Sequence, residues 1–306
     1  MSTATDPAPE TPDVDETVDE VEEAKPVSAW RTVVTSLEGR IGLTLAAIML
    51  VIIALGPYLA PNPPNAIGVG EPFTGLGGDN LIGTDNLGRD VLSRFLSGGR
   101  TVLLVPLGAV TLALLIGGGL GMYGAYTRGR ADAIITRLFD LLMSLPPLLL
   151  VLVLIAGFGT SMPVLIVTVA LVFTPRMGRV IRGASQAVVT SDYVGAAQAR
   201  GETTAAILVR EVLPNAAAPV IADTALRLTY AIIFVATLNF LGLGVQPPSS
   251  DWGLMVSEAR TFVAVAPWAV LAPAAGIAAL SISFNLIADA LTHHITRDTQ
   301  RGVLPL

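Results

Sequence analysis

The chain has 306 residues, of which 52% are hydrophobic and only 14% are charged, and its mean hydropathy is +0.68. Soluble domains are usually about 25% charged, so this composition excludes an ordinary soluble protein. The sequence contains no cysteine, which excludes disulfides, thiolate metal sites and haem-attachment motifs.

The formal net charge of −6 comes from one end of the chain. Residues 1–30 carry nine acidic side chains and one basic side chain, Lys25, whereas the remainder carries fifteen acidic and seventeen basic ones. This stretch has almost no large apolar residue, so it cannot bury enough surface to fold. It also lacks the basic start and apolar core of a signal peptide. We expect residues 1–40 to be a disordered acidic cytosolic tail and lead-in, with contact to a partner as the alternative.

Six apolar segments follow, each close to the roughly 20 residues that a helix needs to cross a bilayer. The first, IGLTLAAIMLVIIALGPYLA, ends in a proline cluster. The predicted spans are residues 41–60, 101–126, 133–157, 162–181, 217–244 and 267–290. Residues 61–100 then form an extracytoplasmic segment, and residues 293–306 form a C-terminal tail. The predicted fold class is an all-α polytopic membrane protein with six transmembrane helices.

The distribution of Lys and Arg predicts the orientation, because cytosolic loops are enriched in both. With a cytosolic N-terminus, thirteen of these residues lie inside or at inner helix ends, including Arg176 at the end of the fourth span, and four lie outside. Both termini are therefore expected in the cytosol. Arg outnumbers Lys seventeen to one, which suggests a GC-rich bacterial genome. The family resemblance described below implies a bacterial cytoplasmic membrane.

Two spans carry further marks. Gly117, Gly121 and Gly124 recur at helical spacing, which favours close approach of a neighbouring helix. Pro146 and Pro147 must break the hydrogen-bond ladder of the third span. A kink there is compatible with a helix that lines a pathway.

One charged excursion interrupts the apolar segments: DYVGAAQARGETTAAILVREVLPN, residues 192–215. We expect Asp192 to cap a short helix that ends near Gly201, and Thr203 or Thr204 to cap a second helix that ends before Pro214. Alanines give the first helix a low surface that fits a groove on another protein; they are Ala196, Ala197 and Ala199. The alternative is an amphipathic helix on the membrane face, but the stretch lacks the bulky apolar stripe of such helices.

This excursion resembles the coupling loop of binding-protein-dependent ABC importer permeases, whose pattern is EAA, three residues, Gly, nine residues and I-x-LP. Gly195-Ala196-Ala197, Gly201 and Leu213-Pro214 stand at the matching positions. Gly195 replaces the Glu of the motif, and Glu211 stands where Ile is usual.

Three other segments resemble C-type permeases of dipeptide and oligopeptide importers. They are GTDNLGRDVLSRFLSGGRTVL at 83–103, FLGLGVQPPSSDWGLM at 240–255 and FNLIADAL at 284–291. The resemblance covers about residues 80–292 and leaves the acidic tail outside.

The resemblance implies an ABC importer type I permease fold, with a permease core at residues 101–292 and a coupling loop at 192–214. The residues carried over to that loop are Asp192, Tyr193, Gly195, Ala196, Ala197, Gly201, Leu213 and Pro214. It implies that the chain is no enzyme and binds no cofactor, and that ATP and Mg²⁺ bind to partner subunits. The only lysine, Lys25, cannot complete a phosphate-binding loop, which agrees with this.

The implied partners are a second homologous permease, two ATPase subunits or one fused ATPase, an extracytoplasmic solute-binding protein and the lipid bilayer, with no nucleic acid. The implied cargo is a dipeptide or oligopeptide, with nickel, haem or another small solute as the alternative. A secondary transporter driven by an ion gradient would need intramembrane carboxylates and an inverted repeat, and the sequence offers only Asp223. A membrane anchor without transport is disfavoured by the four motifs.

Two polar groups remain open to two interpretations each. Asp223 and Arg227, one turn apart in the fifth span, form either a pathway pair or a structural ion pair, and the second is favoured. Asp85, Arg89 and Asp90 either face the external binding protein or serve turn and helix-start chemistry. The adjacent His293 and His294 point to different faces, so we expect them to be solvated surface and no metal site.

Overall fold

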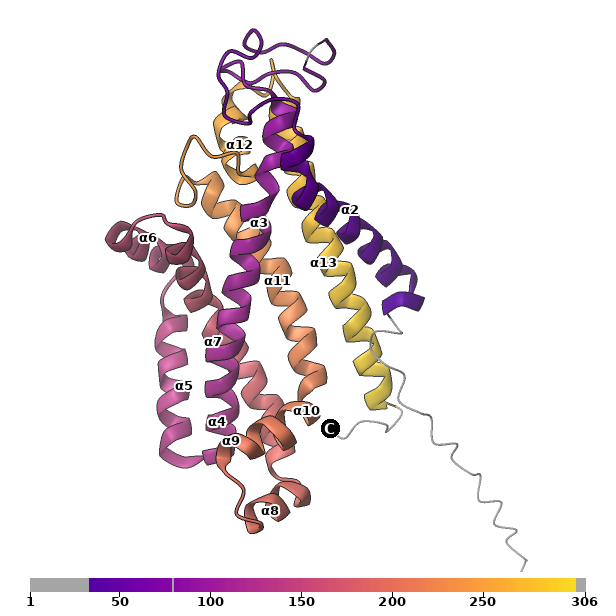
Figure 1. Cartoon of the computed structure of the whole chain (residues 1–306). Coiled ribbons are helices and arrows are strands. Elements are labelled where there is room, and N and C mark those ends of the chain that lie inside the picture. Colours follow the sequence, from indigo (N-terminus) through magenta and orange to yellow (C-terminus); the bar gives the residue numbers. More distant parts are fainter. Residues whose placement is uncertain (1–32, 79, 301–306) are drawn as a thin grey trace, which may run out of the picture.

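The computed structural model describes residues 33–78 and 80–300, with side chains described up to residue 292. Most of the expected disordered tail therefore lies outside the described residues, as do the side chains of His293 and His294. Its last four residues, 37–40, contradict the expectation because they form the first turn of the helix Leu37–Leu59. The described chain is helical, and its only β-type pairing consists of two isolated bridges, Gly77 to Asn80 and Thr84 to Asp90. The predicted all-α class is confirmed (Figure 1).

Five helical runs within the described residues are long and apolar enough to cross a membrane. Four of them are α2 (Leu37–Leu59), α7 (Met162–Val189), α11 (Ala217–Phe240) and α13 (Trp268–Gln300). The fifth is a continuous run of α3 (Val91–Ala113), a π-helical turn (Leu114–Gly118) and α4 (Gly119–Thr127). A sixth candidate is the pair α5 (Gly129–Ser144) and α6 (Pro147–Phe158). The chain is thus a multi-pass membrane protein with up to six spans.

Several helices extend beyond the apolar segments that predicted them. The helix predicted from residue 101 begins at Val91, because Asp90 caps it by accepting a hydrogen bond from the Ser93 amide at 3.1 Å. The fourth span continues from 181 to Val189, and the last runs to Gln300, into the predicted tail. Backbone hydrogen bonds do not require apolar side chains, so a helix can outrun its hydrophobic segment.

The third predicted span is broken rather than merely kinked. Leu145 and Pro146 are extended, as residues before proline prefer to be, and α6 restarts with Pro147 in its first turn. The two helices meet at 88°. In Figure 1, α6 accordingly lies across the end of α5 instead of continuing it.

Two of the three predicted glycines bring the π turn and α4 against α7, whereas the third, Gly124, faces Asp132 of α5. A Cβ at Gly117 would lie 2.3 Å from the Thr174 carbonyl oxygen, and one at Gly121 would lie 2.3 Å from that of Gly178. Only glycine permits such an approach of two backbones.

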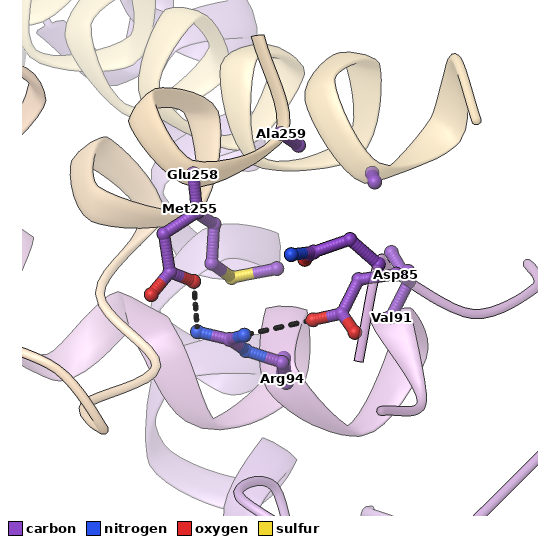
Figure 2. Close-up of a pocket in the computed structure, with 8 residues that line it drawn as sticks. Asp85, Val91, Arg94, Met255, Glu258 and Ala259 are labelled. Carbon is purple, nitrogen blue, oxygen red and sulfur yellow. Dashed lines mark hydrogen bonds and ion pairs between the residues drawn. The ribbon is translucent and has the colours of Figure 1, made fainter. Parts of the chain in front are cut away.

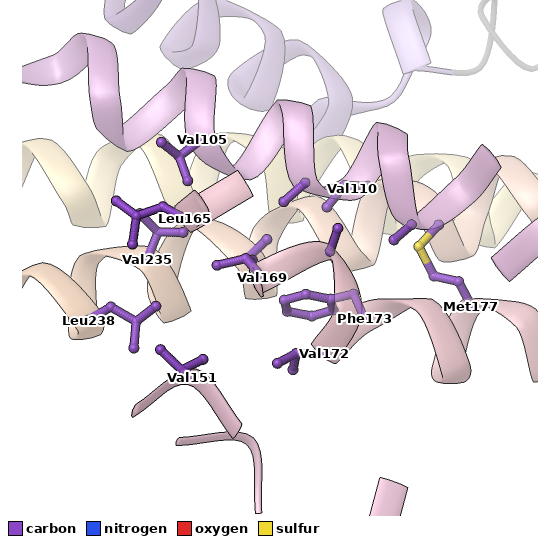
Figure 3. Close-up of a cluster of buried hydrophobic side chains, with 14 of the residues drawn as sticks. Val105, Val110, Val151, Leu165, Val169, Val172, Phe173, Met177, Val235 and Leu238 are labelled. Atoms are coloured by element: carbon purple, nitrogen blue, oxygen red, sulfur yellow. The ribbon is translucent and has the colours of Figure 1, made fainter. Parts of the chain in front are cut away.

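The largest buried apolar cluster joins α3, α6, α7 and α11. Figure 3 shows Val105 and Val110 from α3, Val169 and Phe173 from α7, and Val235 from α11 among its members. These helices therefore form one packed unit around α7.

The connecting segments gather at two opposite ends of the molecule (Figure 1). One end holds the long segment before α3, together with α12 (Trp252–Ala259) and the 3-10 turn Arg260–Phe262. The other end holds α8 (Asp192–Ala199), α9 (Thr204–Ile207), a second π turn (Leu208–Val212) and α10 (Leu213–Asn215). The excursion thus projects beyond the spans as a separate helical element.

Candidate functional site

The first short helix of the excursion begins at the residue that was expected to cap it. Ser191 occupies the N-cap position with extended backbone angles, and Asp192 lies in the first turn of α8. The predicted cap at Asp192 is therefore wrong. Its carboxylate still stands where the positive end of the helix dipole favours a negative charge.

Gly201 ends α8 in a left-handed conformation, with φ of +76°. The Gly201 amide donates to the Gln198 carbonyl at 2.9 Å, and the Glu202 amide donates to the Ala197 carbonyl at 3.2 Å. This pair of hydrogen bonds is a Schellman motif, which strongly favours glycine. The predicted helix end at Gly201 is confirmed.

The second helix starts as predicted but does not stop where expected. Thr203 is its N-cap, and its hydroxyl accepts a hydrogen bond from the Ala206 amide at 3.3 Å. Helical backbone continues through the π turn and past Pro214 to Asn215. Pro214 is tolerated because it lies in the first turn of α10, where its missing amide hydrogen costs little.

A small hydrophobic cluster fastens the excursion to the membrane helices. Val194, Ala197, Ile207 and Val212 are fully buried in it, packed with residues at the end of α7 and the start of α11. The excursion is therefore packed directly against the end of α7 and the start of α11.

The burial of Ala197 contradicts the prediction that all three alanines face a partner. Ala197 is 0% exposed and contacts its own chain, whereas Ala196 and Ala199 are exposed. The outward face of α8 also presents Tyr193, which is 40% exposed, and Gly195, beside which a Cβ would meet nothing within 4 Å. This face is low and open, as docking into a groove requires.

The opposite end of the molecule is held by a cluster of two arginines and two acidic side chains, three of them buried and the fourth, Glu258, half-buried. Arg94 lies between two carboxylates, 2.9 Å from Asp85 and 3.0 Å from Glu258 (Figure 2). Arg89 also contacts both, at 2.6 Å and 2.8 Å. The cluster is electrically balanced, and it joins the segment before α3 to α12.

Asp85, Arg89 and Asp90 therefore serve the chain's own structure. All three are buried, with at most 6% of the residue surface exposed, and Asp85 also accepts hydrogen bonds from the amides of Leu87 and Arg89. The turn and helix-start interpretation accounts for them, and side chains this buried do not support direct contact with a binding protein.

Asp251 caps α12 at the same end of the molecule. Its carboxylate accepts hydrogen bonds from the Gly253 and Leu254 amides at 2.8 and 3.2 Å. Burial nevertheless dominates and raises the pKa of Asp251 to about 6, although those amides lower it in part.

Ion pairs also tie helices together within the spans. Arg182 of α7 binds Asp132 of α5 through two nitrogens at 2.5 and 2.6 Å, and Arg179 pairs with Asp140. Neither pair could be found from the sequence, because the partners stand 50 and 39 residues apart. Among the described residues, no three His, Cys, Asp or Glu side chains form an arrangement able to hold a metal ion.

Asp223 and Arg227 form the ion pair that their spacing predicts, with 2.9 Å between the nearest nitrogen and oxygen. Arg227 also lines a groove between α7, α11 and the start of α6, whereas Asp223 is not among its lining residues. Within this ion pair, only Arg227 therefore faces the groove.

Comparison with known proteins agrees with this architecture. The family described as binding-protein-dependent transport system inner membrane component matches residues 107–301. A putative peptide transport system permease protein of Brucella suis biovar 1 (strain 1330) is 34% identical over 82% of this chain and 85% of its own. The dipeptide transport system permease protein DppC of Alkalihalophilus pseudofirmus is 33% identical over 87% and 88%. The di/tripeptide transport system permease protein DppC of Pseudomonas aeruginosa (strain UCBPP-PA14) is 36% identical over 83% and 86%.

Fold and site together define a multi-pass helical membrane protein with one helical excursion that projects beyond its spans. The chain belongs to the family of binding-protein-dependent transport system inner membrane components, and it is a permease component of an ABC importer. The membership confirms the resemblance found in the sequence and excludes the secondary transporter considered there.

Proposed function

We propose that this chain forms one half of the pathway of a peptide importer. It pairs with a second homologous permease, and an extracytoplasmic solute-binding protein delivers the cargo to the two. Peptides are favoured over nickel or haem because the relatives are named for peptide, dipeptide and di/tripeptide transport.

The excursion at residues 192–214 carries the proposal. Two ATPase subunits, or one fused ATPase, bind ATP and Mg²⁺, and one of them receives the outward face of α8. Its closure moves α7 and α11 through the cluster that buries Val194, Ala197 and Val212. A rigid contact of this kind needs two arrangements and no reactive side chain.

The orientation follows from the same assignment. If α8 meets the ATPase, the excursion lies in the cytosol, with the end of α13 on the same side (Figure 1). Both termini are then cytosolic, in agreement with the excess of Lys and Arg on that side.

The absence of cysteine makes a direct test simple. Ala196→Cys on α8 should react with a membrane-impermeant thiol reagent only from the cytosolic side, and should crosslink to the ATPase subunit. Leu76→Cys, exposed at the opposite end, is the matched control and should react only from outside. Labelling of both from one side, or no crosslink from Ala196→Cys in the assembled complex, would contradict the assignment.

Uptake by the reconstituted complex tests the cargo. Liposomes that contain both permeases and the ATPase should accumulate a labelled dipeptide when ATP and loaded binding protein are present, and should not accumulate nickel or haem. The isolated chain should hydrolyse no ATP. Import of nickel or haem instead of peptide would overturn the cargo but leave the permease assignment intact.

A further inference from the structure

An amphipathic groove of about 340 Å³ opens on the surface formed by α7, α11 and the start of α6. Its apolar part includes Phe173 and Phe234, whose rings pack edge to face with centroids 6.1 Å apart. Tyr230, 55% exposed, adds an aromatic ring with a polar tip. The volume falls in the range of pockets for small ligands, which is about 300–1,000 Å³.

Two arginines, Arg176 and Arg227, supply the charge of this groove. Arg227 is neutralised by Asp223, at 2.9 Å. Arg176 is exposed, and no hydrogen bond or ion pair within the described part of the chain involves its side chain. The groove therefore carries one uncompensated positive charge beside aromatic surface.

The depth of Arg176 makes this charge unusual. The sequence placed it at the inner end of a span ending at 181, but α7 runs from Met162 to Val189. Fourteen residues separate Met162 from Arg176, so at 1.5 Å per residue it stands about 21 Å along the helix. Taking Met162 as the outer edge of the hydrocarbon core, which is about 30 Å thick, puts Arg176 within membrane depth, where a charged side chain marks a partner or a water-filled path.

We propose that Arg176 and Arg227 form a contact site for the carboxylate of the cargo, with Phe173, Phe234 and Tyr230 receiving the adjacent apolar side chain. A guanidinium presents a planar pair of donors that matches a carboxylate. A free peptide C-terminus combines a carboxylate with a neighbouring side chain, which is the combination that this groove offers. The inference rests on the proposed peptide cargo and adds a residue-level source of preference within the permease.

An acidic residue of the second permease is the competing partner for Arg176. The cargo is favoured because the charge faces a cavity of ligand size with aromatic walls. A constitutive ion pair between subunits would require no such cavity. The two partners differ in their consequences, because loss of an ion pair between permeases weakens assembly whatever the cargo.

The test compares a dipeptide, Ala–Phe, with its C-terminal amide in the reconstituted complex. Affinity of the binding protein for each is measured separately, and uptake is measured with the binding protein saturated. The variants are Arg176→Gln, and Asp223→Asn with Arg227→Gln, which removes the ion pair without leaving a buried acid. Arg176→Lys tests rescue by charge, and Arg40→Gln, an exposed arginine at the start of α2, is the control outside the groove.

We expect Arg176→Gln to lower uptake of the free acid roughly tenfold, the scale of one lost hydrogen bond to a charged group. Uptake of the amide should change less than about twofold, because the neutral amide offers a single carbonyl acceptor and cannot form the charge-assisted pair. The double variant should act in the same direction, Arg176→Lys should recover most of the activity, and Arg40→Gln should change nothing.

Three results would overturn the site. The first is that uptake of the acid and of the amide falls by the same factor. The second is that neither variant changes the ratio of acid uptake to amide uptake. The third is that Arg176→Gln complexes lose the second permease during purification. The last result would assign Arg176 to an ion pair between subunits. Failure of the proposed function looks different, since the unmodified complex would then import neither peptide.

Discussion

Replacing either of two glycines by alanine should change the local stability of the excursion in opposite directions: one glycine lies inside α8, and the other ends it. A Cβ added at Gly201 or at Gly195 meets nothing within 4 Å, so neither change to alanine creates a clash. Gly201 has φ of +76°, and an L-residue there costs about 1–2 kcal/mol. Gly195 lies inside α8, where alanine is favoured over glycine by about 1 kcal/mol.

The two variants should therefore differ in local stability by about 2–3 kcal/mol, which is roughly a 30- to 160-fold difference in the opening equilibrium. Hydrogen–deuterium exchange at the Gly201 and Glu202 amides reports this opening, because both are bonded within the motif. Exchange there should be faster in Gly201→Ala and slower in Gly195→Ala.

Loss of local stability at Gly201 should also weaken the coupling between ATP hydrolysis and uptake. In the reconstituted complex, Gly201→Ala should lower uptake per ATP hydrolysed, because a softened excursion transmits less of the ATPase movement. Gly183→Ala on α7, which also meets no atom within 4 Å, is the control outside the excursion. If Gly201→Ala left both exchange and coupling unchanged, the Schellman motif would not be what holds the excursion, and the reasoning would fail.

Three further predictions concern burial and charge. Ala197→Trp should destabilise the protein by about 1–3 kcal/mol through overpacking, whereas Ala196→Trp on the exposed face should leave the thermal midpoint unchanged but weaken ATPase association in pull-down; equal effects would contradict the assigned faces. Arg94→Ala should cost about 3 kcal/mol, at the low end for a broken buried ion pair, because Arg89 still contacts buried Asp85 and half-buried Glu258, and exposed Arg100→Ala should cost less than about 1 kcal/mol in the same unfolding assay. The pKa of Asp251, raised to about 6 from an ordinary value of 3.8, means that the folded state holds this proton more tightly. The contribution of this proton to the free energy of unfolding is full below about pH 4 and is lost as the pH rises through 6. Between pH 5 and 7, the free energy of unfolding of the wild type should therefore fall by about 1 kcal/mol relative to that of Asp251→Asn. Parallel pH profiles of the two proteins would refute this.

Local sequence signals determined much of the architecture. Apolar length predicted the spans, Pro146 and Pro147 predicted an interrupted hydrogen-bond ladder, and the glycine and threonine at 201 and 203 predicted the two helices of the excursion. Each of these features depends on residues close in the chain, through hydrogen-bond capacity, φ preference or hydropathy. The four family motifs were likewise sufficient for the permease assignment, because each is a contiguous stretch of residues.

Tertiary structure alone decided which side chains are buried and which are paired. Arg89 and Glu258 lie 169 residues apart, so no spacing rule connects them. Ala197 and Ala196 are identical in chemistry, and only packing against α7 and α11 separates the inner one from the outer one. Arg176 was placed at a helix end because hydropathy stops where polar residues begin, whereas the helix itself continues to Val189. Contacts between distant segments fix these outcomes, and a single sequence contains no local term that encodes them.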